Sequence, residues 1–91
     1  MSADALEPLR LRFRQRAGQE SRHLADALAR GDISEIERLA HGLAGVAGLF
    51  GFADVSAQAL EIDGEFARGE ALSLDKVRAL IIALERLSPY S

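Results

Sequence analysis

The chain has 91 residues, of which 48% are hydrophobic and 27% charged, and its formal net charge is −3. This size and composition are typical of one folded domain, and the lack of a basic surplus argues against nucleic acid as a partner. The absence of cysteine excludes disulfides and thiolate metal sites. The first residues resemble no signal peptide and no apolar stretch approaches the roughly 20 residues of a membrane span, so we expect a cytoplasmic domain without membrane contact.

Glycine and proline divide the chain into four expected helices. The first is expected from about Pro8 to Arg30, with Pro8 in its opening turn and Gly31 as its C-terminal cap. Its inward stripe contains one charged residue and consists of Phe13, Ala17, Glu20, Leu24, Ala27 and Leu28.

The second helix is expected to begin after Asp32, because Asp32 and Glu35 have the spacing of a capping box. Its apolar positions recur at helical spacing: Ile36, Leu39, Ala40, Leu43, Val46, Ala47 and Phe50. Gly51 then permits a break in the chain.

The third helix is expected to end near Gly69, and its stripe consists of Phe52, Val55, Ala59, Ile62 and Phe66. Ser73 is expected to cap the fourth helix and Pro89 to prevent its continuation. The inward residues of this helix are Val77, Leu80, Ile81, Leu84 and Leu87. Because the connections are short, we predict an all-α, up-down-up-down antiparallel four-helix bundle that spans residues 1–91 as one domain.

The second helix contains an unusual run of glycines beside one histidine, His41. The glycines that follow it are Gly42, Gly45, Gly48 and Gly51. Three interior glycines cost a helix about 3 kcal/mol relative to alanine, which a small domain seldom tolerates without compensation. Residues three, four and seven apart share a helix face. The face of His41 therefore carries Arg38, Gly45 and Gly48, and it predicts close approach of a partner protein to the imidazole.

His41 is expected to face solvent, and a neutral imidazole has a ring nitrogen that can attack phosphorus. The adjoining sequence contains no Ser, Cys, Lys or second His to activate a substrate. We therefore expect an acceptor of a group that a partner activates, while an ordinary surface histidine is the alternative. The second histidine, His23, is expected to be solvated rather than to ligate a metal. No metal site is expected.

The segment His41–Gly51 resembles the motif His-x-Leu-Lys-Gly-Ser-Ala-Gly-x-x-Gly of the histidine-containing phosphotransfer (HPt) domains of multistep two-component phosphorelays. The matching residues are His41, Leu43, Gly45, Ala47, Gly48 and Gly51. The resemblance covers about residues 13–88. It implies a phosphocarrier in signal transduction, with His41 forming the phosphohistidine, rather than an enzyme.

The resemblance also implies the partners, which would be response-regulator receiver domains and a hybrid histidine kinase. The receiver would supply Mg²⁺ and the activating residues, so that this chain has no cofactor of its own. The residues expected to dock the partner are Arg38, Ala44, Gly45 and Gly48. We expect a monomer, and the opening Met1 favours a free-standing shuttle.

One departure from the motif is Ala44, which replaces the lysine of the family. Arg38 and, less directly, Arg68 are the candidates for supplying the missing positive charge beside a phosphoryl group. A degenerate module that docks receivers or kinases without efficient transfer is the alternative function. A structural dimerisation element ranks third, because no helix shows a second continuous apolar stripe.

Overall fold

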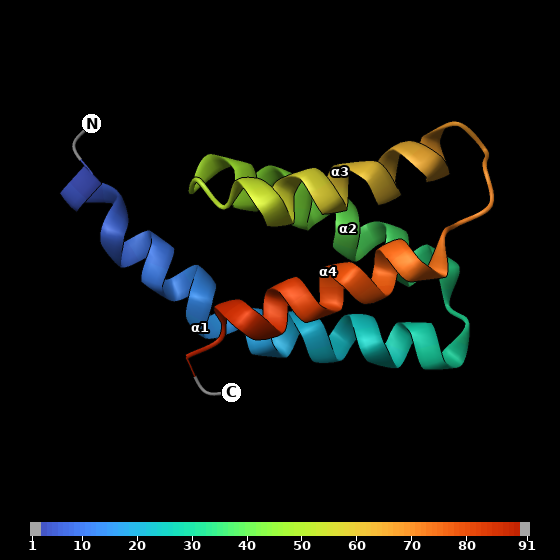
Figure 1. Ribbon diagram of the computed structural model, residues 1–91, viewed down its shortest axis with the longest axis horizontal. Helices are drawn as coiled ribbons and strands as arrows, with labels where there is room; N and C mark the ends of the chain where they lie inside the picture. The colour runs from blue at the N-terminus through green and yellow to red at the C-terminus, as the bar shows by residue number, and fades with distance from the viewer. Residues whose placement is uncertain (1–2, 90–91) are drawn as a thin grey trace.

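The computed structural model describes residues 3–89. These residues form four α-helices and no β-strand: α1 (Ala3–Arg30), α2 (Ile33–Leu49), α3 (Ala53–Ala67) and α4 (Leu74–Leu87). Each helix packs against its neighbours in the sequence, and α1 also packs against α4. The all-α helical bundle expected from the sequence is therefore confirmed (Figure 1). Within the described part of the chain, no helix is both long and apolar enough to cross a membrane.

The start of the first helix differs from the prediction. Helix α1 begins at Ala3, so Pro8 lies inside it rather than in the opening turn. Pro8 is the sixth residue of α1, so it lies beyond the first four residues, whose N–H groups have no helical acceptor, and it costs the helix one hydrogen bond. The first part of α1 projects beyond the other helices (Figure 1).

Contacts with aromatic residues anchor this projecting part. The Arg10 guanidinium donates to the carbonyl oxygen of Phe50 and lies 4.6 Å above the ring of Phe52. The ring of Phe13 stacks on Phe52 with 4.9 Å between the centroids. The connection between α2 and α3 is thereby fixed against α1.

The first three helices end in the same way. Gly31, Gly51 and Gly69 have φ angles of 67°, 81° and 70°, a region that glycine enters without steric cost. After each glycine, the next N–H bonds back to a carbonyl of the last helical turn, at 2.9, 2.8 and 2.9 Å respectively. This is the Schellman arrangement, and it confirms the predicted ends of these helices.

The expected capping box at the start of α2 forms only in part. The Asp32 carboxylate accepts from the Glu35 N–H at 3.2 Å, as predicted. The return bond is missing because the Asp32 N–H bonds to the carbonyl of Ala27 and the Glu35 side chain pairs with Arg38. At α4 the Ser73 hydroxyl accepts from the Lys76 N–H at 3.4 Å, which confirms that cap.

Two residues of the predicted core stripes are exposed. Val46 and Phe66 retain 44% and 42% of their accessible surface, whereas Ala44 and Glu65 are buried. Glu65 tolerates burial because its carboxylate accepts from the Ser73 N–H and from Lys76. These hydrogen bonds hold the pKa of Glu65 below its usual value. The buried face of α2 is therefore shifted toward Ala44, and that of α3 toward Glu65 and its polar contacts with α4.

Candidate functional site

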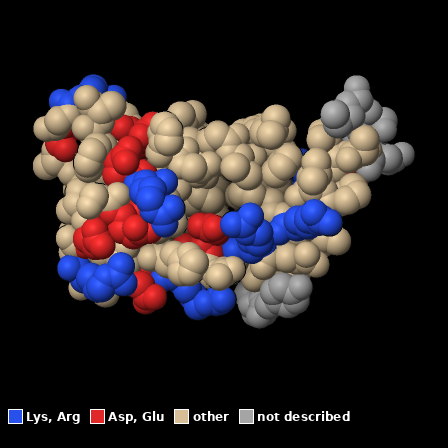
Figure 2. Space-filling model, turned by 180° about the vertical axis from the view of Figure 1, so that it is seen from behind, with Lys and Arg blue, Asp and Glu red and all other residues tan. Residues whose placement is uncertain are grey.

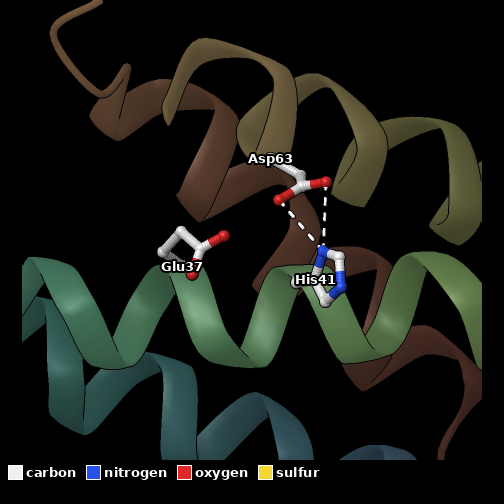
Figure 3. A group of neighbouring side chains, drawn as sticks. All are labelled: Glu37, His41 and Asp63. Atoms are coloured by element: carbon white, nitrogen blue, oxygen red, sulfur yellow. Dashed lines mark hydrogen bonds and ion pairs between the residues drawn. The ribbon is translucent and has the colours of Figure 1, made fainter. Parts of the chain in front are cut away.

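His41 lies on α2 opposite α3, and 73% of its side chain is exposed. Its Nδ1 atom is 3.3 Å from both carboxylate oxygens of Asp63 on α3 (Figure 3). The Asp63 side chain is only 25% exposed. The expected solvent-facing imidazole is present, and its orientation is set by a carboxylate on a different helix.

The contact with Asp63 determines which ring nitrogen of His41 is free. An ionised carboxylate can only accept hydrogen bonds, so the nitrogen that faces it must carry the proton. In the neutral imidazole the lone pair then lies on Nε2. The nitrogen with a free lone pair is thus the one that does not face Asp63.

Glu37 completes a small polar cluster around His41. It lies one helical turn before His41 on α2, and a ligand atom from each of Glu37, His41 and Asp63 lies within 4.8 Å of the others. Among the described residues, none forms a hydrogen bond or ion pair with the half-buried Glu37 side chain. Figure 3 shows this carboxylate on the side of α2 that faces Asp63.

The two candidate cations are engaged elsewhere. Arg38 is exposed, but its guanidinium binds the Glu35 carboxylate, with Nε 3.1 Å from Oε1. These hydrogen bonds lower the pKa of Glu35 and raise the pKa of Arg38. Arg68 donates to Glu70 at 2.9 and 3.0 Å. The proposal that either arginine supplies a charge at His41 therefore finds no support in the contacts observed.

Ala44 does not lie on the exposed docking face where the sequence analysis placed it. It is 8% exposed, and its carbonyl oxygen accepts from the Ser56 hydroxyl of α3 at 3.0 Å. The reason is its direction around the helix, which points toward α3. A lysine at this position would have to extend along the interface between α2 and α3 to reach solvent.

The glycines of α2 have different surroundings. A Cβ atom added to Gly45 or Gly42 would meet no heavy atom within 4 Å, whereas one added to Gly48 would lie 3.0 Å from the Ser56 hydroxyl. Gly45 therefore leaves an open surface beside His41, as expected. Gly48 is exposed but also lies close to α3, so its role in partner docking stays a prediction, and Gly42 is not explained by helix packing.

The stretch of chain that follows His41 carries no charged residue. Residues 39–53 contain no Asp, Glu, Lys or Arg, and Val46 and Leu49 on this segment are 44% and 71% exposed. Seen from behind, the molecule has a broad uncharged area bordered by arginines and carboxylates (Figure 2). Such a surface suits contact with another protein.

Comparison with known families identifies the fold and its general role. The model of the Hpt domain matches residues 8–89, which is nearly the whole chain. The chain belongs to the Hpt domain family. Hpt domains carry out histidine phosphotransfer in phosphorelays, in which they interact with receiver domains and kinases. No curated protein and no solved structure shows a significant match to this chain.

Asp63 and Glu37 are the residues of this site that the sequence analysis missed. Glu37 had a detectable signal, since it precedes His41 by four residues and so shares its face. Asp63 had none, because it is one of several acidic residues on α3 and is 22 positions away.

Proposed function

We propose that this Hpt domain is a phosphorelay carrier. It accepts a phosphoryl group on His41 from the aspartyl phosphate of one receiver domain and passes it to another receiver. The observation that carries this proposal is the exposed imidazole whose Nδ1 faces Asp63 at 3.3 Å, so that Nε2 remains free as the nucleophile.

The reaction needs little from this chain. The Nε2 lone pair attacks phosphorus, an N–P bond forms, and the bond between phosphorus and the aspartyl oxygen of the receiver breaks, which releases the carboxylate. The ring becomes positively charged as the bond forms, and Asp63 stabilises that charge while it holds Nδ1–H. Mg²⁺ and the activating groups belong to the receiver, so the chain acts as a carrier without a cofactor of its own and not as an enzyme.

The surroundings of His41 support docking of a receiver. The open position at Gly45 removes side-chain bulk on the face of His41, and the apolar side chains of Val46 and Leu49 are exposed on the same helix. We further propose that the four helices alternate in direction, because residues 31–32, 50–52 and 68–73 form short connections. A cytoplasmic monomer, loaded by a hybrid histidine kinase through its receiver, completes the proposal.

A transfer experiment tests the function. The chain is incubated with a ³²P-labelled receiver domain and Mg²⁺, and label on the chain is tested for the acid lability and base stability of phosphohistidine. We expect label on the wild type and on His23→Gln, and none on His41→Gln. All three should share one helical circular dichroism spectrum, because both imidazoles are exposed.

The outcomes separate the possibilities. Label on His41→Gln contradicts the assignment of the acceptor. Binding of the receiver without any label on the folded wild type favours the degenerate docking module instead.

A further inference from the structure

We infer that Glu37, His41 and Asp63 form a binding site for Zn²⁺ or a similar divalent transition-metal ion, and that the bound ion stops His41 from accepting a phosphoryl group. The second half of this inference rests on the proposed function. The first half concerns metal binding alone and is tested separately.

The three side chains have the chemistry and spacing of a metal site. Imidazole nitrogen with carboxylate oxygen suits zinc, whereas Mg²⁺ prefers oxygen ligands alone. With metal–ligand bonds of about 2.0–2.2 Å, neighbouring ligand atoms of a tetrahedral site lie about 3.4 Å apart. His41 Nδ1 is 3.3 Å from the Asp63 oxygens, and all three ligand atoms lie within 4.8 Å of one another. Small side-chain rotations therefore suffice to bring the three ligand atoms to the spacing of a tetrahedral metal site.

The state of Glu37 is the second observation that points to a cation. Its carboxylate lies near that of Asp63, and among the described residues it has no hydrogen bond or ion pair. Two carboxylates held this close repel each other, and a divalent ion removes that repulsion. Glu61 and Glu65 on α3 differ, because both carboxylates are already paired with Lys76.

The site is also partly formed before any ion binds. Glu37 and His41 are one turn apart on α2, and Asp63 projects from α3 (Figure 3). Three protein ligands leave the fourth position of a tetrahedral ion open to water, as in zinc sites that exchange ligands. Exposure of His41 gives the ion a path from solvent.

Metal binding and phosphoryl acceptance exclude each other because of the single ring proton. Coordination through Nδ1 displaces the proton that Asp63 holds. A neutral imidazole then carries its proton on Nε2, which no longer has a lone pair to attack phosphorus. Zinc is thus an inhibitor in this proposal and not a cofactor of the transfer.

Binding is tested by calorimetric titration of the metal-free chain with ZnCl₂. We expect one ion per chain in the wild type and an affinity at least about tenfold lower in Glu37→Gln, Asp63→Asn and His41→Gln. His23→Gln and Asp26→Asn change the same residue types at exposed positions of α1 and should bind zinc as the wild type does. Circular dichroism establishes that each variant is folded.

Two results overturn the metal site. One is the absence of zinc binding up to millimolar concentration. The other is a loss of affinity in His23→Gln or Asp26→Asn that equals the loss in the site variants. In a parallel NMR titration, MgCl₂ should leave the chemical shifts of the His41 imidazole unchanged. A change in these shifts equal to that caused by zinc contradicts the selectivity for zinc.

Nitrogen NMR of the imidazole tests the mode of binding. Zinc should move the proton of His41 from Nδ1 to Nε2, whereas coordination through Nε2 contradicts the proposed geometry. This measurement needs no phosphorylated partner.

The effect on transfer is measured last, as the ratio of labelling rates with and without zinc in the presence of Mg²⁺. We expect zinc to slow labelling at least about tenfold in the wild type and in Asp26→Asn, and to slow it less in Glu37→Gln. A wild type that binds zinc at His41 but keeps its labelling rate contradicts the inhibition. A chain that takes no label even without zinc refutes the proposed function and leaves the metal site standing.

Discussion

Replacement of Gly45 by leucine separates stability from partner binding. Gly45 lies inside α2, one turn after His41, and a Cβ built on it meets no heavy atom within 4 Å. The folded domain therefore has room for a side chain there. A receiver domain that docks on the face of His41 would lack this room, because the leucine side chain would stand on that face.

The two effects have opposite signs and can be estimated. Leucine in place of an interior glycine stabilises a helix by about 0.5–1 kcal/mol. In a domain of this size that raises the melting temperature by about 2–8 °C. Displacement of a receiver from its best contact is expected to weaken binding at least about tenfold, which is roughly 1.4 kcal/mol.

Thermal melts and calorimetric titration with a receiver that binds the wild type measure both effects. Gly42→Leu is the matched control, because Gly42 is equally open but lies about 100° around the helix from His41. Gly42→Leu should be stabilised as much as Gly45→Leu and should bind the receiver more tightly than Gly45→Leu does. An unchanged dissociation constant for Gly45→Leu refutes the steric role, and a lower melting temperature refutes the reading of Gly45 as open.

Three further predictions follow from contacts of the same helices. Gly48→Ala should stabilise the fold less than Gly45→Ala in thermal melts, because its Cβ forces the Ser56 hydroxyl, 3.0 Å away, to move; equal gains contradict this. Glu65→Gln should lower the melting temperature at neutral pH, since the hydrogen bonds that depress the pKa of Glu65 stabilise the fold above the ordinary glutamate pKa. That stabilisation is lost as the pH falls through the lowered pKa, so wild type and variant should converge in acid, and a constant difference refutes the argument. Ala44→Lys should stabilise phosphorylated His41 by about 0.5–1 kcal/mol at low salt, because the lysine can extend to the surface. Arg38→Ala should leave labelling rates unchanged, because the Arg38 guanidinium is bound to Glu35. Gel-based transfer rates for both variants check this pair, and a slow Arg38→Ala contradicts it.

The C-terminal ends of α1, α2 and α3 and the starts of α2 and α4 were predictable because local chemistry sets them. Gly31, Gly51 and Gly69 adopt positive φ at the positions expected of C-terminal caps. Asp32 and Ser73 cap the following helices with their side-chain oxygens, as their sequence positions indicated. Each of these contacts involves residues within about one turn of each other, so the sequence alone carries the signal.

Features that depend on how two helices cross were not predictable from one helix at a time. Val46 and Ala44 exchange their expected exposure because α3 approaches α2 on the side of Ala44, where the Ser56 hydroxyl reaches its carbonyl. Asp63 meets His41 only because of the same crossing. Arg38 was placed on the correct face, but its side chain turns back to Glu35, a choice that helical periodicity does not determine.

These contacts also bear on the energy of a phosphoryl group at His41. Phosphorylation adds a charge of about −2 at His41. The carboxylates of Glu37 and Asp63 lie close to the ring. The two candidate cations, Arg38 and Arg68, are bound to other carboxylates. On the proposed function, the repulsion raises the free energy of the phosphorylated domain, although Asp63 still favours the positive ring. A group held at higher free energy passes readily to a receiver, whose aspartate site supplies Mg²⁺ to neutralise it. The absence of the family lysine at Ala44 is then consistent with a carrier that transfers its phosphoryl group rather than one that stores it.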